Sequence, residues 1–157
     1  MIMKKVSFVL VIAFIIITNS FKPAAEIKWL GFNEGYTLAK KTKKIMLIDT
    51  YTEWCGWCKR MDRDTYAKSE IAELVNKDFV AIKFNPEVTA NYNFEGKTYA
   101  GNQLAGVISD NQINGYPTTI FLQPKTIKKK VIVGYKNAEQ MQGELSAAIS
   151  ELNPNKK

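Results

Sequence analysis

The hydrophobic pattern of the chain predicts two buried strands joined by a helix. Two aliphatic runs stand out, IMLIDTY at residues 45–51 and FVAIKF at residues 79–84, and runs of this length are typical of buried strands. From Trp57 onward the intervening sequence repeats apolar residues at helical spacing, with Ser69 as the expected cap of a second helical piece. The pattern therefore predicts a strand–helix–strand unit whose strands pair in parallel.

Shorter patterns predict the elements on either side of this unit. A short extended segment near Trp29 is followed by a helix that we expect to begin with Asn33 as its N-cap. Later in the chain, PTTIFL at residues 117–122 and KVIVGY at residues 130–135 are rich in residues that favour strands. Their close spacing predicts an antiparallel hairpin.

The two remaining segments differ in how clearly their hydrophobic patterns predict secondary structure. Asn137 and Gln140 form a capping-box pattern before a final amphipathic helix, whose apolar face is expected to hold Met141, Leu145, Ile149 and Leu152. Residues 86–115 are mostly polar and predict only a turn at Glu95-Gly96 and a short helix near residues 102–108.

The first 25 residues have the composition of a signal peptide. Lys4 and Lys5 precede an uncharged apolar run at residues 6–18, which is long enough for a signal peptide but short for a membrane span. We expect cleavage between about residues 20 and 25, which leaves residues 26–157 as one domain. The protein is then exported, periplasmic or secreted. The alternative is an uncleaved segment that anchors it to a membrane.

Composition and charge indicate a soluble globular domain rather than a nucleic-acid-binding protein. The chain has 157 residues, a size that fits a single core, and a net charge of +7. Removal of residues 1–25 takes three lysines and no acid, which lowers the net charge to +4. The densest basic runs, at residues 40–44 and 128–130, are short and are interpreted as solvated faces. No nucleic-acid partner is predicted, and we expect a monomer.

Cys55 and Cys58 are the only cysteines, and the chain has no histidine. A structural zinc site needs four ligands of these two types, so no metal and no other cofactor is predicted. Three explanations of the cysteine pair stay open at this point. They are a metal site completed by acids or shared by two chains, a structural disulfide, and a redox pair. The structural disulfide is the weaker explanation, because closing so short a loop contributes only about 2 kcal/mol.

The redox interpretation has a physical basis in the expected start of the helix. A cysteine at a helix N-terminus meets unpaired N–H groups and the positive end of the helix dipole, which stabilise its thiolate. Cys58 follows nearly one turn later, within reach of the first sulfur. Cys55 is therefore the expected nucleophile and Cys58 the resolving thiol.

The segment TEWCGWCKRM resembles the active site of the thioredoxin family, whose W-C-x-x-C motif reads Trp54-Cys55-Gly56-Trp57-Cys58 here. Asp49 in the preceding strand is similar to the buried acid of the family, and Lys83 to the lysine that approaches this acid. The segment INGYPTTIF is similar to the one that carries a cis proline, at Pro117. The resemblance extends over nearly all of residues 26–152. It implies an α/β thioredoxin fold with a central mixed sheet flanked by helices.

The resemblance also implies an activity and roles for these residues. The expected protein is a thiol–disulfide oxidoreductase that forms a redox disulfide between Cys55 and Cys58. Asp49 relays the Cys58 proton, Lys83 supports Asp49, and Pro117 is catalytic. The substrate contacts flank an exposed sulfur: Trp54, Gly56, Trp57 and Tyr116.

The expected partners are proteins that carry disulfides or dithiols and one redox partner that the sequence does not identify. A membrane is a partner only if the signal segment stays uncleaved. Because no histidine lies between the cysteines, we expect reduction or exchange of disulfides rather than strong oxidation. The alternatives are an oxidant or isomerase, and a non-catalytic binding or chaperone module on the same fold.

Overall fold

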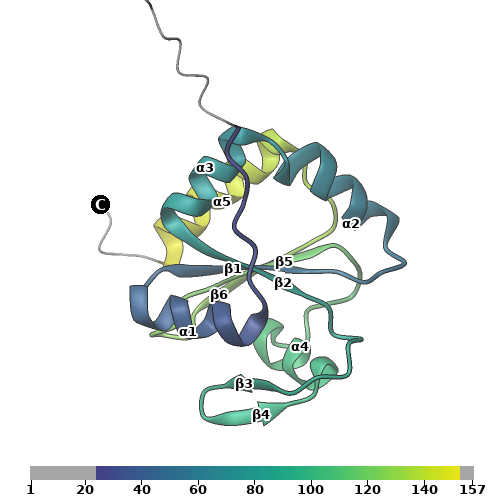
Figure 1. Cartoon of the computed structure of the whole chain (residues 1–157), viewed down its shortest axis with the longest axis vertical. Helices are drawn as coiled ribbons and strands as arrows, with labels where there is room; N and C mark the ends of the chain where they lie inside the picture. The colour runs from purple at the N-terminus through teal and green to yellow at the C-terminus, as the bar shows by residue number, and fades with distance from the viewer. Residues whose placement is uncertain (1–23, 153–157) are drawn as a thin grey trace, which may run out of the picture.

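A four-stranded mixed sheet forms the centre of the protein (Figure 1). The computed structural model describes residues 24–152, so the predicted signal peptide lies almost wholly outside the described residues. The strand order is β2-β1-β5-β6, in which β2 is parallel to β1 and the other neighbours are antiparallel. The strands are β1 (Ile45–Thr50), β2 (Phe79–Phe84), β5 (Thr118–Leu122) and β6 (Lys129–Val133).

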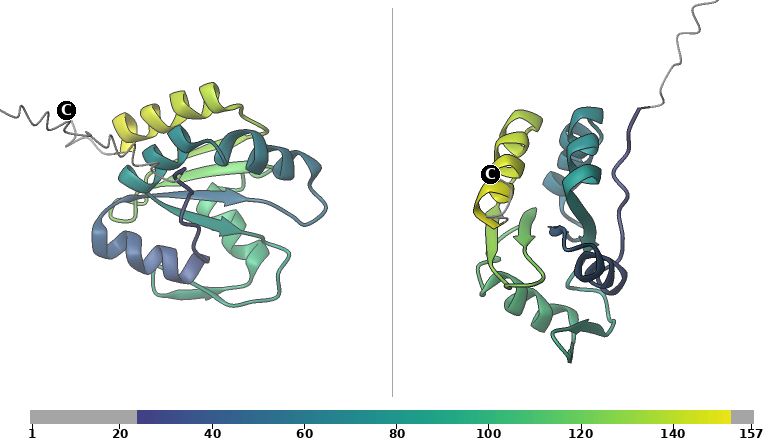
Figure 2. Two further views of the ribbon diagram at one scale, coloured as in Figure 1. Left: turned by 45° about the horizontal axis from the view of Figure 1, so that its top comes forward. Right: turned by 90° about the vertical axis from the view of Figure 1, so that its left-hand side faces the viewer.

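Helices cover both faces of this sheet, as Figures 1 and 2 show. One face carries α1 (Phe32–Thr42) and α4 (Gly101–Ser109). The other carries α2 (Gly56–Met61), its π-helical continuation η1 (Asp62–Tyr66), α3 (Ser69–Asp78) and α5 (Ala138–Leu152). A small hairpin of β3 (Tyr92–Phe94) and β4 (Lys97–Tyr99) lies beyond α4. Within residues 24–152, no helix has the length and apolar character needed to cross a membrane.

The alternation of side chains along β1 divides the core into two layers. Ile45 and Leu47 pack among the apolar residues of α3 and α5, whereas Met46 and Ile48 pack against those of α1 and α4. Asp49 continues the first series, so its carboxyl lies on the same face of the sheet as α2, α3 and α5. A buried acid is thereby placed behind the helix that carries the cysteines.

Most predicted elements are confirmed. The two strands of the parallel pair, the hairpin of β5 and β6, and the final helix all form. Asn137 and Gln140 make the reciprocal capping-box hydrogen bonds, with N···O distances of 3.0 and 2.9 Å. The predicted turn at Glu95-Gly96 and helix near residues 102–108 also form, but the sequence did not reveal β3 and β4 on either side of that turn.

Two predicted helix caps are wrong. Gly31 is the N-cap of α1 and makes no side-chain cap, because the Asn33 amide is used elsewhere: it donates to the Asn91 carbonyl at 3.1 Å and accepts from the Asn93 N–H at 2.8 Å. Asn33 thus fixes the loop that leads into β3. Ser69 is the first residue of α3 rather than its cap, a position that Lys68 occupies without a side-chain hydrogen bond.

Gly35 marks the closest approach of α1 to the sheet. A Cβ at this position would lie 2.4 Å from Cγ1 of the fully buried Ile82. We expect Gly35→Ala to lower the free energy of unfolding by about 1–2 kcal/mol, because overpacking displaces neighbouring side chains. Gly143→Ala is the control, because the space beside this exposed residue of α5 is open, and it should stabilise by roughly 0.5–1 kcal/mol. Urea unfolding of both variants measures the difference, and equal effects would contradict it.

Candidate redox site

Cys55 and Cys58 form a disulfide at the start of α2, with an S–S distance of 2.02 Å. Cys55 is the N-cap of the helix, and its Sγ accepts a hydrogen bond from the Cys58 backbone N–H at 3.1 Å. The sulfur was expected to be exposed, but Cys55 is only 4% accessible and Cys58 3%. The two cysteines are buried because they cap and enter the helix on its inner side, while the flanking tryptophans stay outside. The helix begins at Gly56, so Cys55 lies at its N-terminus as expected.

Asp49 is a buried acid held by Lys83 from the neighbouring strand. The two residues face each other in the β1–β2 register, and Lys83 Nζ donates to Asp49 Oδ2 at 2.6 Å. Asp49 Oδ1 is buried and makes no hydrogen bond to the described residues. Burial raises the pKa of Asp49 to about 6, against the opposing attraction of Lys83. A carboxyl with this pKa can take up and release a proton near neutral pH.

Lys83 also binds a second carboxylate, that of Asp62, the first residue of η1. Its ammonium lies over three aromatic rings, with Nζ 4.8 to 5.7 Å from the centroids of Trp29, Tyr51 and Tyr66. Burial lowers the pKa of Lys83, but the two carboxylates outweigh this effect and raise it above its usual value. Lys83 is therefore held as a cation between a buried acid and a half-exposed one.

The sequence analysis did not single out Asp62. It follows Cys58 by four residues, so the signal available in the sequence was an acid one helical turn beyond the second cysteine. Asp62 and Lys83 also line a cavity of about 390 Å³. Of the two carboxylates bound to Lys83, that of Asp62 is therefore open to solvent, whereas that of Asp49 is buried.

The Tyr116–Pro117 segment lies at the same end of the sheet as the cysteines. The Tyr116–Pro117 peptide bond is cis, and the next residue, Thr118, pairs with Thr50 at the end of β1. The rings of Tyr116 and Trp54 meet edge to face, with centroids 5.9 Å apart. This contact joins the loop before β5 to the residue that precedes Cys55.

Two exposed tryptophans flank the disulfide, and each belongs to a different cluster. Trp54 is 68% accessible and Trp57 55%. Trp57 packs on Tyr135 at 5.5 Å between ring centroids, and the Arg60 guanidinium lies over both rings at 5.1 and 5.4 Å. Gly56, between the tryptophan pair, is exposed, and a Cβ there would meet no neighbouring atom. The structure therefore shows no steric requirement for glycine at this position.

Glu87 completes the cluster around Trp54 and was not predicted. The Trp54 indole N–H donates to both carboxylate oxygens of Glu87, at 3.1 and 3.2 Å. Burial raises the pKa of Tyr116, and the nearby Glu87 carboxylate adds to the effect. Glu87 follows β2 in a polar segment without a recognisable pattern, so only the fold brings it beside the tryptophan.

The chemistry available at the site is a two-electron exchange between a dithiol and a disulfide. Cys55 and Cys58 supply the sulfurs, and Asp49 supplies a group that can exchange a proton. Within residues 24–152, the acids and cysteines form no group of three or more that is suited to hold a metal ion. The arrangement holds the two sulfurs, a proton carrier and an aromatic surface within one end of the sheet.

Comparisons with known proteins agree with this arrangement. The family model Thioredox_DsbH, described as "Protein of unknown function, DUF255", matches residues 20–152. A solved thioredoxin from Thermus thermophilus superposes with a TM-score of 0.65 at 18% identity, covering 84% of this chain and 94% of the other. A structure titled "DsbH Oxidoreductase" gives 0.62 at 17% identity, covering 85% and 93%. These superpositions confirm the predicted thioredoxin fold.

The curated relatives are much longer proteins. Spermatogenesis-associated protein 20 from Homo sapiens is 22% identical over 109 residues, which is 69% of this chain and 13% of that protein. The chain spans about an eighth of the length of the first such relatives. The similarity therefore concerns one domain of those proteins.

Proposed function

Because the chain belongs to the thioredoxin-like family that the DsbH model describes, we propose that it is an exported thiol–disulfide oxidoreductase that reduces or exchanges disulfides in other proteins. The observation that carries the proposal is the Cys55–Cys58 disulfide at the N-terminus of α2, with the Asp49–Lys83 pair behind it. The export of the protein rests on the composition of residues 1–25. Its partners are disulfide-bearing polypeptides and a redox protein that restores the dithiol.

The proposed reaction begins with the reduced protein. The Cys55 thiolate, which the Cys58 N–H and the helix start stabilise, attacks one sulfur of a substrate disulfide and releases the other as a thiolate. Asp49 takes the proton of Cys58, whose thiolate then attacks Cys55 Sγ. The intermolecular disulfide breaks and the second substrate sulfur leaves as a thiolate; the proton from Cys58 and one from solvent convert the two substrate thiolates to thiols, and the protein keeps the disulfide. Two electrons have passed from protein to substrate.

The position of the Tyr116–Pro117 segment supports a role for this segment in holding the substrate. Pro117 has no backbone N–H, and the Tyr116 ring packs against Trp54 beside Cys55. We propose that an extended substrate segment lies along this backbone with its sulfur at Cys55, as in β-strand addition. Trp54 and Trp57 then contribute exposed apolar area on the two sides.

The reduction potential tests the proposed direction. Among the described contacts, the Cys55 sulfur accepts a single hydrogen bond, from the Cys58 N–H, so its thiolate lacks the extra stabilisation that makes a strong oxidant. In glutathione buffers we expect a potential closer to the roughly −270 mV of thioredoxin than to the roughly −120 mV of DsbA. The protein should also reduce insulin faster than a variant in which both cysteines are serine. A potential near that of DsbA would contradict the direction, and the absence of insulin reduction would contradict the enzymatic proposal.

A further inference from the structure

We propose that the cavity beside Tyr116, between the Pro86-Glu87 segment and α4, receives a lysine or arginine side chain of the substrate polypeptide, which Glu87 binds. The inference rests on the proposed function, since it describes how that substrate is selected. It assigns a specificity role to the segment between β2 and β5, for which the sequence predicts a turn and a helix but no function.

The cavity lies next to the surface where the substrate is proposed to bind. It has a volume of about 280 Å³, which is small for a separate ligand and sufficient for one long side chain. Tyr116, the residue before the cis proline, forms one of its walls. The other walls come from the segment after β2 and from α4 and the loop after it, and include Pro86, Glu87, Asn102, Ser109 and Asn111. A segment bound along Tyr116 and Pro117 can therefore direct a side chain into this cavity.

The chemistry of the walls favours a cation. Among the residues lining this cavity in the described part of the chain, Glu87 is the only charged one. Its carboxylate accepts a single N–H, from Trp54, and an ionised carboxylate has about four acceptor positions. Asn102 and Asn111 also line the cavity; the Asn102 carbonyl oxygen accepts the Gln103 N–H at 2.8 Å and keeps a second acceptor position. An ammonium or guanidinium group finds a charge partner and further acceptors here, whereas an acidic side chain meets only repulsion from Glu87.

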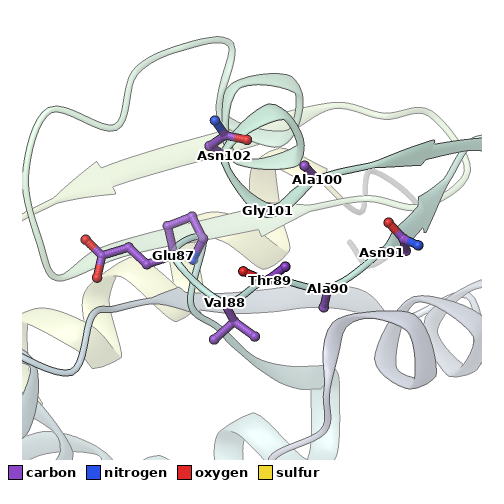
Figure 3. Close-up of a pocket in the computed structure, with 9 residues that line it drawn as sticks. Glu87, Val88, Thr89, Ala90, Asn91, Ala100, Gly101 and Asn102 are labelled. Carbon is purple, nitrogen blue, oxygen red and sulfur yellow. The ribbon is translucent and has the colours of Figure 1, made fainter.

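A larger neighbouring cavity, of about 520 Å³, is a poorer match for a cation. It shares Pro86, Glu87 and Asn102 with the smaller cavity, but it also includes the first turn of α4, at Ala100 and Gly101, where the helix dipole is positive. Figure 3 shows the Glu87 side chain extending away from Ala100 and Asn91. The carboxylate accepts the Trp54 indole N–H and lies close enough to Tyr116 to raise its pKa, so its charge lies toward these two residues.

The preference for a cation is local and opposes the charge of the whole chain. The sequence carries a net charge of +7, or +4 without residues 1–25, and Arg60 lies over the aromatic pair on the Trp57 side of the disulfide. The overall field alone would favour acidic substrates. A preference for lysine at one position of the substrate is therefore diagnostic of the Glu87 cavity and would not follow from the charge of the protein.

The test uses the reduced full chain and a set of nine-residue peptides with one central cysteine, each joined by a disulfide to the chromophore nitrothiobenzoate. Cys55 attacks the peptide sulfur and releases nitrothiobenzoate as a coloured thiolate, and Cys58 then displaces the peptide thiol and restores the protein disulfide. Lysine, norleucine or glutamate is placed in turn at each position within three residues of the cysteine. The rate of colour release gives the second-order rate constant for each peptide.

At one position we expect lysine to react about fivefold faster than norleucine, and glutamate slower than both, at low salt. In Glu87→Gln, which keeps an acceptor for Trp54, the lysine-to-norleucine ratio should fall below about twofold. Asn102→Phe, which narrows this cavity and the larger one that Asn102 also lines without removing a charge, should lower the ratio in the same way. Glu53→Gln is the matched control, because Glu53 is an exposed acid beside Trp54 that does not line the cavity.

The possible outcomes distinguish the proposed oxidoreductase function from the proposed binding of a lysine or arginine side chain in the cavity. If no peptide reacts faster than with the double-serine variant, the proposed function fails. If all peptides react but no position favours lysine, or if Glu53→Gln lowers the ratio as much as Glu87→Gln, the cavity proposal fails while the oxidoreductase stands. A ratio that depends on Glu87 and on Asn102 but not on Glu53 supports the cavity.

Discussion

Replacing Cys58 by serine is expected to turn the protein into a trap for its substrates. The hydrogen bond that stabilises the Cys55 sulfur comes from the backbone N–H of residue 58, so serine leaves it in place. Attack by Cys55 should therefore proceed, but no thiol follows to break the mixed disulfide. Insulin reduction should fall to the level of the double-serine variant. A covalent adduct that reducing agent releases should accumulate on non-reducing gels.

Cys55→Ser is the matched control for this trap. It keeps one thiol, at position 58, inside the helix rather than at its N-cap. We expect no adduct from Cys55→Ser with the same substrates. Equal adduct formation by both variants would show that the two sulfurs are equivalent nucleophiles, which would contradict the roles assigned to them. Mass spectrometry of adducts isolated from the compartment to which the protein is exported would also identify the substrates.

The sequence predicts those parts of the fold in which the residue pattern is compatible with only one kind of secondary structure. β1 and β2 are mostly apolar because both faces of the sheet are covered, and such runs leave little choice of structure. The hairpin of β3 and β4 has only three residues in each strand, too few for a recognisable strand pattern. Asn33 holds the start of β3 through tertiary hydrogen bonds, and no local pattern reports such bonds.

The residues of the site also divide into those that the sequence predicts and those that it does not. Cys55, Cys58 and Asp49 stand out in the sequence because a thiol pair is rare and an acid in an apolar strand is costly to bury. Asp62 and Glu87 are acids in polar segments, where acids are common. Only the fold brings Asp62 to Lys83 and Glu87 to Trp54. The residues that tune a site are therefore harder to predict than those that react.

Asp49→Asn is expected to slow the reaction and stabilise the oxidised protein at the same time. Asparagine cannot take the Cys58 proton, so release of the mixed disulfide at pH 7 should slow by about 100-fold. The free energy of unfolding should rise, because the wild-type protein buries a carboxylate whose pKa is raised from 3.8 to about 6. That shift corresponds to at most about 3 kcal/mol at neutral pH. Loss of one partner of Lys83 offsets part of the gain, because Asp62 remains its only carboxylate.

The pH dependence identifies the cause of this stabilisation. A carboxyl whose pKa is raised in the folded state contributes to stability below pH 4, where it is protonated in both the folded and the unfolded protein. This contribution is lost as the pH rises through about 6. The variant should therefore match the wild type near pH 4 and gain its full advantage above pH 6 in urea unfolding. Asp110→Asn, which removes an exposed partner of Lys129, should change stability by less than about 1 kcal/mol. An advantage of Asp49→Asn that is equal at pH 4 and pH 7 would show that packing, not the titration of Asp49, is responsible.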